Sequence, residues 1–233
     1  MLYKLILIMN ERIACVGIIM DGNRRWARTH DTSVSEGHNE GYKKLQEVVR
    51  WSRDAGIPHV VAYAFSTENW QRSEDEVGYL MKLFRSVLES ETKKMTEERV
   101  RVLFVGDRSR FSEDMQKMME DMEKATATTY DVTLHLLMSY GGRAEILAAA
   151  NALTGEETLV TEDLFAQKLW SHPMPDPDLI IRTGGEKRLS GFLPWQSVYS
   201  ELFFSDSLWP DFTEEEFNSI LAEFATRERR RGK

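Results

Sequence analysis

The chain has 233 residues, of which 42% are hydrophobic and 29% are charged, a composition that indicates an ordinary globular protein. Its formal net charge of −8 argues against a general nucleic-acid binder, because such proteins usually carry an excess of basic residues. The single cysteine, Cys15, excludes an intrachain disulfide and suits a reducing compartment. The apolar opening MLYKLILIM is shorter than the ~20 residues of a membrane-spanning helix and lacks a signal-peptide cleavage pattern. We therefore expect a cytoplasmic protein.

Short apolar runs rich in β-branched and aromatic residues predict six strands. In chain order they cover residues 13–20, 59–65, 100–105, 132–138, 179–181 and 201–204. Helical patterns lie between most of these runs. Leu45, Val48 and Val49 define a first apolar stripe, and residues three and four apart between Val77 and Leu88 define a second one.

A third helix is predicted by the four methionines between positions 115 and 122. The last one begins with a capping-box pattern, in which Thr213 is followed by Glu216. No low-complexity linker or internal repeat divides the chain. The alternation predicts one α/β domain over residues 1–233, with a six-stranded, mostly parallel sheet flanked by helices on both faces. We expect residues 1–12 to form a flexible N-terminal segment of this domain.

Residue types that bind phosphate follow nearly every predicted strand. In chain order these motifs read MDGNRRW, STENWQR, GDRSR, SYGGRAE and RTGGEKRLSGF. Ligands of open α/β sheets bind beyond the carboxyl ends of the strands, so these motifs are expected to meet at one edge. Arginine offers a bidentate fork to phosphate oxygens, and glycine lets backbone amides approach them. The sequence therefore predicts an anion-binding edge of the sheet.

Two separate clusters stand out within these motifs. The first contains Asp21, Gly22, Asn23, Arg24 and Arg25, and the segment GHNEG at 37–41 joins it. The second contains Arg182, Arg188 and Ser190, with Gly184 and Gly185 between them. A bare carboxylate would repel a phosphate, whereas Mg²⁺ often binds through one carboxylate together with substrate phosphates. Asp21 is therefore predicted to be a magnesium ligand between two phosphate-bearing groups.

Two other classes of protein fit part of this pattern. In a phosphatase of the haloacid dehalogenase type, Asp21 would be the nucleophile and Asp107 would hold the metal. That class needs a second acid two residues after the nucleophile for general acid–base catalysis, and this chain has Asn23 there. A non-catalytic module for anionic ligands would have no need for a metal-binding Asp21. A transferase that acts on two phosphate-bearing substrates accounts for both arginine clusters.

Eight stretches between about Val16 and Gly232 resemble the cis-prenyltransferases, whose best-known members are the undecaprenyl diphosphate synthases. They read IIMDGNRRWA, GHNEG, AYAFSTENWQR, VGDRSRF, SYGGRAEI, DLIIRTGGEKRLSGFLPWQSVYSELFF, LWPDF and RERRRG, in the family's order. The resemblance implies a homodimer-forming α/β domain with an apolar tunnel walled by two helices and the sheet. It implies Mg²⁺-dependent condensation of an allylic prenyl diphosphate with isopentenyl diphosphate, each new double bond being cis. Coupling of two allylic diphosphates on the same fold stays open, as does a peripheral membrane contact for product release.

The resemblance also implies roles for individual residues near the first cluster. Asp21 serves the magnesium ion, and the late Glu201 assists it. The allylic diphosphate is held by Gly22, Asn23, Arg24, Arg25 and His38. Ser66 and Asn69 assist catalysis, while Arg72 and Trp70 lie with them on the allylic side.

A second set of implied roles concerns isopentenyl diphosphate and the dimer. Isopentenyl diphosphate is held by Arg182, Arg188 and Ser190, and Arg230 and Gly232 reach across the dimer to a substrate phosphate. A dense apolar stretch near the C-terminus is either core or shared between subunits. It contains Leu202, Phe203, Phe204, Leu208, Trp209 and Phe212.

Two positions near the allylic motifs depart from the family pattern. Val34, which we assign to a loop, stands where the family commonly has an arginine, four residues before His38. Arg24 replaces a glycine of many bacterial members. The local positive charge is therefore moved rather than lost, and we expect an altered preference for the allylic substrate. The small side chains of Ala64 and Val132 are expected near the tunnel floor, where they permit a long product.

Overall fold

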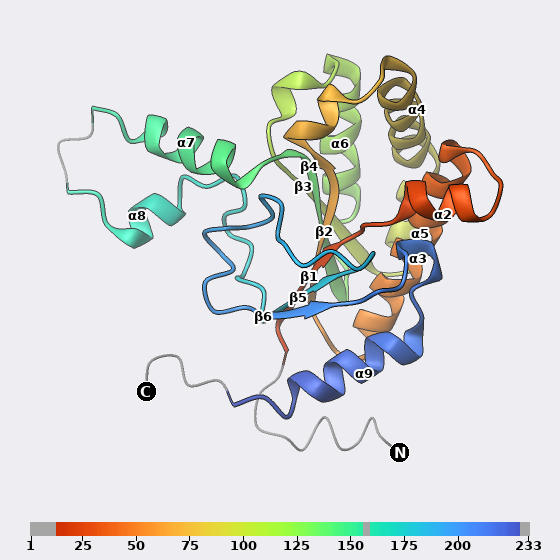
Figure 1. Ribbon diagram of the computed structural model, residues 1–233. Helices are drawn as coiled ribbons and strands as arrows, with labels where there is room; N and C mark the ends of the chain where they lie inside the picture. Colours follow the sequence, from red (N-terminus) through yellow and green to blue (C-terminus); the bar gives the residue numbers. More distant parts are fainter. Residues whose placement is uncertain (1–12, 156–158, 229–233) are drawn as a thin grey trace.

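The computed structural model describes residues 13–155 and 159–228 (Figure 1). Within these residues six strands form one sheet: β1 Cys15–Ile19, β2 His59–Ser66, β3 Val100–Val105, β4 Val132–Tyr140, β5 Leu179–Arg182 and β6 Glu201–Phe204. The α-helices are α2 Asn23–Thr29, α3 Val34–Asp54, α4 Glu74–Ser90, α5 Thr92–Glu97, α6 Glu113–Ala125, α7 Gly142–Ala152, α8 Glu162–Ala166 and α9 Glu214–Phe224. Three short 3₁₀ helices are η1 Thr67–Gln71, η2 Arg108–Arg110 and η3 Trp209–Asp211. The predicted flexible segment, residues 1–12, lies outside the described residues.

The sheet has the strand order β3-β4-β2-β1-β5-β6, and every described pair of neighbours is parallel. This arrangement confirms the predicted single α/β domain, and the six predicted strands are found within two residues of their expected ends. From β1 the chain passes to β2 on one side, whereas β5 lies on the other side of β1. The boundary between β1 and β5 is therefore a switch point of the strand order, where open α/β sheets bind their ligands.

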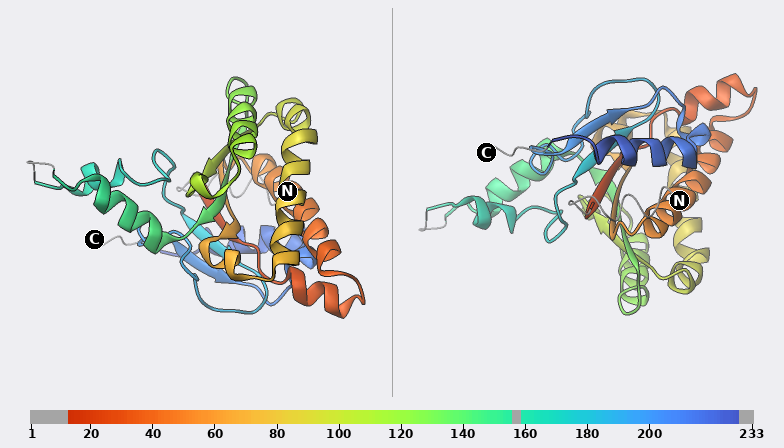
Figure 2. Two further views of the ribbon diagram at one scale, coloured as in Figure 1. Left: turned by 90° about the horizontal axis from the view of Figure 1, so that it is seen from above. Right: turned by 90° about the horizontal axis from the view of Figure 1, so that it is seen from below.

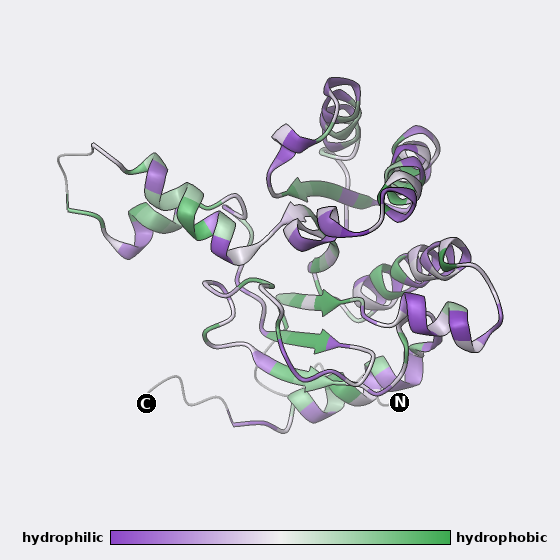
Figure 3. Ribbon diagram, turned by 45° about the horizontal axis from the view of Figure 1, so that its top comes forward, coloured by the Kyte–Doolittle hydropathy of each residue, from purple (hydrophilic) through white to green (hydrophobic). Residues whose placement is uncertain are grey.

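One face of the sheet carries most of the helices. Apolar side chains of α3, α4, α5, α6 and α9 join the strands in one core cluster, in which Val48, Phe84, Met119 and Phe217 are buried. The predicted stripes on these helices are therefore core stripes. Figure 3 shows the consequence, with apolar colour along the strands and polar colour on the outer sides of the helices. Burying this surface is the main source of the fold's stability.

The opposite face is covered mainly by loops, which differs from the expected helices on both faces. A second cluster there includes Leu137, Tyr140, Phe192 and Leu193, and the last two come from the long segment 183–200. Helices α7 and α8 project beyond the edge of the sheet (Figure 2). The physical reason lies in the composition of α7, where only Gly142, Glu145 and Ala149 are buried, so it has no wide apolar stripe to pack on the sheet.

The capping box predicted before the last helix is only half formed. The side-chain oxygen of Thr213 accepts a hydrogen bond from the backbone amide of Glu216 at 3.2 Å, which caps α9. The carboxylate of Glu216 instead accepts hydrogen bonds from the hydroxyls of Ser205 and Ser207. Helix α9 is thereby tied to the segment that follows β6.

Candidate active site

Asp21 lies just beyond the carboxyl end of β1, next to the end of β5. The buried hydroxyl of Thr183 holds its backbone on both sides, because it accepts from the Asp21 amide at 3.1 Å and donates to the Asp21 carbonyl at 2.7 Å. Gly22 follows with φ of 121°, and a Cβ there would lie 2.9 Å from the backbone of Leu208. Only glycine fits this close approach without strain. The turn after β1 is therefore fixed by two contacts that come from distant parts of the chain.

The two predicted arginine clusters converge on the carboxylate of Asp21. Arg25 of α2 donates to one carboxylate oxygen at 3.1 Å, and Arg182 at the end of β5 donates to the other at 2.8 Å. Arg25 also donates to the carbonyl of Gly184 at 2.7 Å. Gly184 has φ of 84°, and a Cβ at this position would approach the Arg25 guanidinium to 2.4 Å. Asp21 thus lies between the two arginine clusters.

The second cluster is built on the buried side chain of Arg182. Its guanidinium donates to the Ser190 hydroxyl at 2.9 Å and to the carbonyl oxygen of Arg188. The Arg188 side chain is exposed and pairs with Glu186. Tyr63 of β2 donates to the carbonyl of Ser190 at 3.4 Å. The structure therefore brings the three predicted residues of this cluster together, with the side chain of Arg188 exposed at its surface.

A buried polar network that sequence reasoning missed braces the loop of the second cluster. Glu145 of α7 is fully buried and accepts hydrogen bonds from Tyr140 at 2.5 Å and from the Ser171 amide at 2.8 Å. Gln196 donates to the same carboxylate at 3.1 Å. A buried carboxylate is tolerated only when its oxygens are paired in this way. The network ties the loop 183–200 to the end of β4.

The first cluster lines a cavity at the ends of α2 and α3. The lining residues are Met20, Asp21, Gly22, Asn23, Arg24, Arg25, Arg28, His38 and Arg72. Seven of the nine were predicted for the allylic side or the metal; of the other two, Arg28 is a cation that the sequence analysis did not single out, one helical turn after Arg24. Five cationic or imidazole side chains around one cavity indicate a polyanionic ligand, and the geometry suits a diphosphate group.

Helix α2 reaches this position because α3 offers it two glycines. A Cβ on Gly37 would lie 2.4 Å from the carbonyl oxygen of Asn23, and one on Gly41 would lie 2.3 Å from the Asn23 side-chain oxygen. The segment GHNEG, which contains His38, is therefore part of α3. Val34 is likewise the first residue of α3, capped by Ser33, rather than a loop residue.

A carboxylate that the sequence analysis missed gathers three side chains of this cavity. Glu76, in the first turn of α4, accepts from Arg72 at 2.9 Å and lies 3.4 Å from Nε2 of His38. Arg24 lies 3.9 Å from its other oxygen. The signal for Glu76 was weak, because an acidic residue in the first turn of a helix is common for reasons of capping and dipole alone.

The predicted residues of the segment STENWQR, at 66–72, lie at different distances from the cavity. The side-chain oxygen of Asn69 accepts from the amide of Ser66 at 3.0 Å, so the pair forms the turn between β2 and η1. Trp70 lies elsewhere: its indole donates to Ser139 at 3.0 Å and packs edge-on against Phe65. Of the four residues predicted in this motif, the structure places Arg72 alone among the residues that line the cavity.

The cavity of the first cluster lies next to an apolar cavity between α3, α4 and the sheet. The two share Met20, Asn23 and His38 in their walls. The apolar cavity encloses about 1080 Å³, counting its open mouth, and its walls include Leu80, Phe84 and other apolar residues of the core face. Ala64 lies in its wall as predicted, whereas Val132 is buried beneath the surface and is not among the lining residues.

Several predicted site residues are not brought to Asp21. Glu201 begins β6 at the register of Leu179, at the opposite end of the sheet, and its carboxylate pairs with Arg227 at 2.7 Å. Because Asp21 lies beside Arg182 at the other end of β5, the register of the strands keeps Glu201 and Asp21 apart within one chain. Within one subunit, the two residues could not bind the same metal ion. Arg230 and Gly232 lie outside the described residues.

The dense apolar stretch near the C-terminus is largely core. Phe203, Trp209 and Phe212 are buried, and the Trp209 indole stacks on Phe212 and donates to the carbonyl of Gly41 at 2.7 Å. Leu202, Phe204 and Leu208 are half-buried. Phe203, Trp209 and Phe212 are therefore core residues, and only Leu202, Phe204 and Leu208 keep apolar surface that a second subunit could cover.

Asp21 fits a magnesium ion only together with a ligand. Its side chain is 30% exposed at the wall of the cavity of the first cluster. In the described part of the chain, no group of three or more His, Cys, Asp or Glu side chains could hold a metal by itself. Mg²⁺ usually binds through one or two carboxylates, water and substrate phosphates. The donor set here is of that kind.

These features define an α/β protein in which a cavity lined by cations lies next to an apolar cavity. The family model described as putative undecaprenyl diphosphate synthase matches residues 19–232. An isoprenyl transferase of Fusobacterium nucleatum is 43% identical over 219 residues, which are 93% of this chain and 94% of the relative. An isoprenyl transferase of Thermotoga maritima is 43% identical over 222 residues, which are 93% and 95% of the two chains.

Solved structures agree with this similarity. The structure of lavandulyl diphosphate synthase from Lavandula x intermedia, in complex with dimethylallyl diphosphate, has a TM-score of 0.89 and 31% identity, covering 95% of this chain and 98% of that one. A probable undecaprenyl diphosphate synthase from Campylobacter jejuni has a TM-score of 0.82 and 32% identity, covering 96% and 100%. The chain therefore belongs to the undecaprenyl diphosphate synthase family, and it is a prenyltransferase. None of its described helices is both long and apolar enough to cross a bilayer.

Proposed function

We propose that the protein condenses an allylic prenyl diphosphate with isopentenyl diphosphate, in a Mg²⁺-dependent reaction, to give a cis-polyprenyl diphosphate. One observation carries the proposal: a cavity lined by cations and an apolar cavity share Met20, Asn23 and His38 in their walls. A prenyl diphosphate has a polyanionic head joined directly to an apolar chain. Its head suits the first cavity, and its chain suits the second.

The residues of the first cluster bind and orient the allylic substrate. Arg24, Arg25, Arg28 and His38 surround the place of its diphosphate, and each charge-assisted hydrogen bond contributes about 1.5–3 kcal/mol. Asp21 would hold Mg²⁺ together with diphosphate oxygens, and the bound ion would stabilise the negative charge that develops on the leaving diphosphate.

The second cluster binds isopentenyl diphosphate beside it. Arg188 and Ser190 take its diphosphate, and Arg182 fixes their loop through hydrogen bonds to the Ser190 hydroxyl and the Arg188 carbonyl. Because Arg182 also donates a hydrogen bond to Asp21, the distance and orientation between the two bound diphosphates would be fixed. Such preorganisation removes much of the entropic barrier to a reaction between two substrates.

The chemistry that follows needs few protein groups. The bond between the allylic carbon and the diphosphate oxygen breaks, and the terminal alkene carbon of isopentenyl diphosphate forms a carbon–carbon bond with the cation. Loss of a proton from the neighbouring carbon then gives the new double bond. The apolar walls at Leu80 and Phe84 exclude water, which would otherwise capture the cation. Each added unit extends the chain into the apolar cavity, and burial stabilises it by about 0.8 kcal/mol per CH₂.

Coupling of two allylic diphosphates is the second candidate. The observation that favours it is the similarity to lavandulyl diphosphate synthase, which was solved with dimethylallyl diphosphate, an allylic compound. We further propose a homodimer, in which the partner subunit's C-terminal tail would add to the substrate site, and a cytoplasmic location with a peripheral membrane contact for product release.

Product analysis separates these candidates. The protein is incubated with Mg²⁺ and one allylic diphosphate, with and without isopentenyl diphosphate, and the products are identified by mass spectrometry. Elongation predicts products that grow by five carbons and appear only with isopentenyl diphosphate. Products formed from the allylic diphosphate alone would favour coupling, and no prenyl product under any pairing would contradict both candidates.

A further inference from the structure

Glu76 holds a set of side chains that come from different elements of the first cavity. Its carboxylate accepts from Arg72, which precedes α4, and lies 3.4 Å from Nε2 of His38 on α3. Its second oxygen lies 3.9 Å from Arg24 on α2. The Glu76 side chain is only 12% exposed. One carboxylate therefore sets the relative positions of three side chains that line the cavity.

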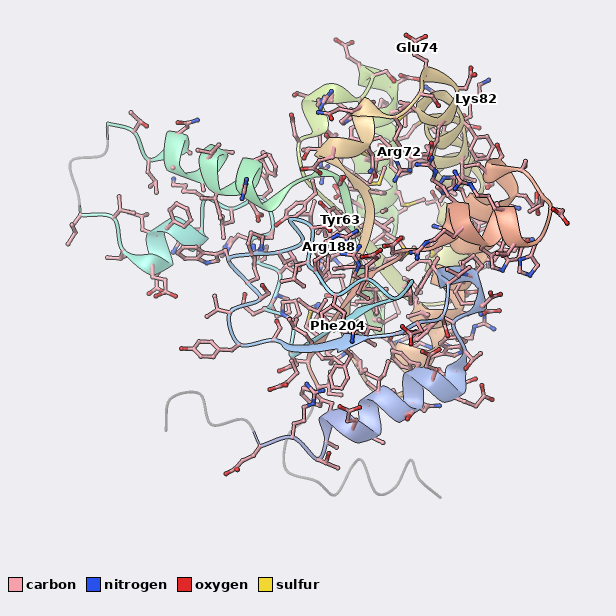
Figure 4. The ribbon with its side chains drawn as sticks, in the orientation of Figure 1. Tyr63, Arg72, Glu74, Lys82, Arg188 and Phe204 are labelled. Carbon is pink, nitrogen blue, oxygen red and sulfur yellow. The ribbon has the colours of Figure 1, made fainter. Side chains whose placement is uncertain are left out.

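Glu76 lies behind these side chains rather than in the cavity. Arg24, His38 and Arg72 belong to the cavity wall, whereas Glu76 does not. Its negative charge reduces the electrostatic repulsion between the neighbouring cations. Because Glu76 is not among the lining residues, it does not occupy the space that a ligand would fill. Figure 4 shows Glu74 at the outer end of α4, pointing away from the body of the protein, and labels Arg72 closer to the centre of the molecule. Glu74 therefore offers a matched carboxylate in the same helical turn.

The contact with Glu76 determines which edge of His38 faces a ligand. A carboxylate accepts hydrogen bonds, so Nε2 of His38 carries the proton that it donates to Glu76. Among the described residues, Nδ1 of His38 has no hydrogen-bond partner. In the neutral imidazole this nitrogen has a lone pair, which would repel a diphosphate oxygen. His38 can donate to a diphosphate through Nδ1 only after it takes up a second proton.

The groups that surround His38 in the protein favour its neutral form. Burial lowers the pKa of His38, and the guanidiniums of Arg72 and Arg24 lower it further, while Glu76 acts in the opposite direction. The charged groups that act on the imidazole are therefore Arg24 of α2, Glu76 in the first turn of α4, and Arg72 just before that helix. A diphosphate placed against Nδ1 would add negative charge on the free side of the ring, which favours the protonated form.

We propose that Glu76 is a positioning residue that couples diphosphate binding to proton uptake, because it holds His38 so that the imidazole becomes an imidazolium between Glu76 and a diphosphate oxygen. The proton comes from solvent and adds to Nδ1, and no covalent bond of the substrate changes. The proposal rests on the proposed function, since it takes the cavity of α2 and α3 to be the place of the allylic diphosphate. Glu76 acts through His38 and Arg72 and does not contact the substrate.

The test is a calorimetric titration with the S-thiolo analogue of dimethylallyl diphosphate, which binds but resists ionisation. Titrations at pH 7.5 with Mg²⁺, in buffers of different ionisation enthalpy, give the number of protons taken up per site. A phosphate ester is almost fully ionised at this pH, so it contributes few protons itself. We expect the wild-type protein to take up about half a proton or more, which corresponds to a bound pKa at or above the working pH.

Glu76→Gln keeps a hydrogen-bond acceptor for Nε2 but removes the charge. We expect its proton uptake to fall below half of the wild-type value and its KM for the allylic diphosphate to rise about tenfold, with kcat little changed. Glu76→Asp should restore part of the proton uptake. Glu74→Gln, which makes the same change of charge in the same turn, should behave like the wild type. Thermal unfolding of each variant confirms that it is folded.

Two results would overturn the proposal. One is equal proton uptake and equal KM in Glu76→Gln and the wild type; the other is wild-type binding without any proton uptake. Absence of binding to the wild-type protein would overturn it as well. Because calorimetry requires binding alone, a protein that binds the analogue with proton uptake but makes no product with isopentenyl diphosphate would contradict the proposed function while supporting the role of Glu76.

Discussion

The carboxylate of Asp21 accepts a hydrogen bond of 2.8 Å from the guanidinium of Arg182, a residue 161 positions further along the chain. The Arg182 side chain is 5% exposed, whereas that of Asp21 is 30% exposed. One end of this pair is therefore fixed in the protein interior, and the other end faces the cavity of the first cluster. The pair is the physical link between the two anion-binding clusters.

Replacing Asp21 by Asn should remove the metal ligand while preserving the shape of the side chain. We expect kcat/KM with an allylic diphosphate and isopentenyl diphosphate to fall by about 10²–10³, the usual loss when one electrostatic contact to a transition state is removed. Steady-state turnover at several Mg²⁺ concentrations measures the effect. Asp31→Asn, which changes an exposed carboxylate in the turn after α2, serves as the control. Near-normal Mg²⁺-dependent turnover of the Asp21 variant would contradict the assignment.

Arg188→Ala should separate the two substrates. The side chain is exposed and makes no contact with Asp21, so we expect stability and the KM of the allylic diphosphate to change little. Loss of one charge-assisted hydrogen bond should raise the KM of isopentenyl diphosphate by about tenfold or more. Lys187→Ala removes a neighbouring exposed cation and should have a much smaller effect. Equal increases of both KM values would mean that the clusters do not bind separate substrates.

Two glycine-to-alanine substitutions should have opposite effects on stability. Alanine favours a helix over glycine by about 1 kcal/mol, and at Gly78 of α4 an added Cβ meets no atom within 4 Å. Gly78→Ala should therefore raise the melting temperature by about 2–4 °C. At Gly37 the added Cβ would lie 2.4 Å from the carbonyl oxygen of Asn23, so Gly37→Ala should lower both the melting temperature and turnover. A stabilised Gly37→Ala protein would show that α2 is not packed against α3 as described.

His135 should make the stability of the protein depend on pH. Burial, and then the neighbouring His59 at 3.1 Å, lowers the pKa of His135 to about 3. Between about pH 6.5 and pH 3 the unfolded chain binds a proton at this imidazole that the folded chain does not bind. The free energy of unfolding should therefore fall with decreasing pH in this window, by up to about 1.4 kcal/mol per pH unit. Urea titrations at several pH values measure the slope, which His135→Gln should reduce; an unchanged slope would contradict this origin.

Substitutions at Val34 and Arg24 test whether these two positions alter the preference for the allylic substrate. Val34 begins α3, four residues before His38, and Arg24 lies 3.9 Å from Glu76. Val34→Arg, alone and together with Arg24→Gly, restores the charge pattern common in the family. We expect a shift in the preferred allylic chain length or in the product distribution, measured by mass spectrometry. If neither variant differs from the wild type, the positions of these charges do not determine substrate preference.

The sequence by itself determined the fold class and the general place of the site. Apolar runs of strand length that alternate with helical stripes leave a parallel sheet as the arrangement that buries both kinds of surface. The carboxyl ends of parallel strands meet at one edge, so Asp21 and Arg182 could be predicted as neighbours from their positions after two strands. Residue types were sufficient to predict this pair, because the geometry of a parallel sheet brings the ends of neighbouring strands together.

Tertiary structure alone decided which side chains pair. Nothing in the local sequence distinguishes Glu76 from Glu74, yet only Glu76 faces His38 and Arg72, because the packing of α4 against α3 fixes its rotation. The position of Glu201 was also decided by tertiary structure. The resemblance groups it with Asp21, whereas within one subunit the register of β6 against β5 puts it at the other end of β5 from Arg182. Register and helix rotation are set by side-chain packing over the whole core, and a short motif contains no information about either of them.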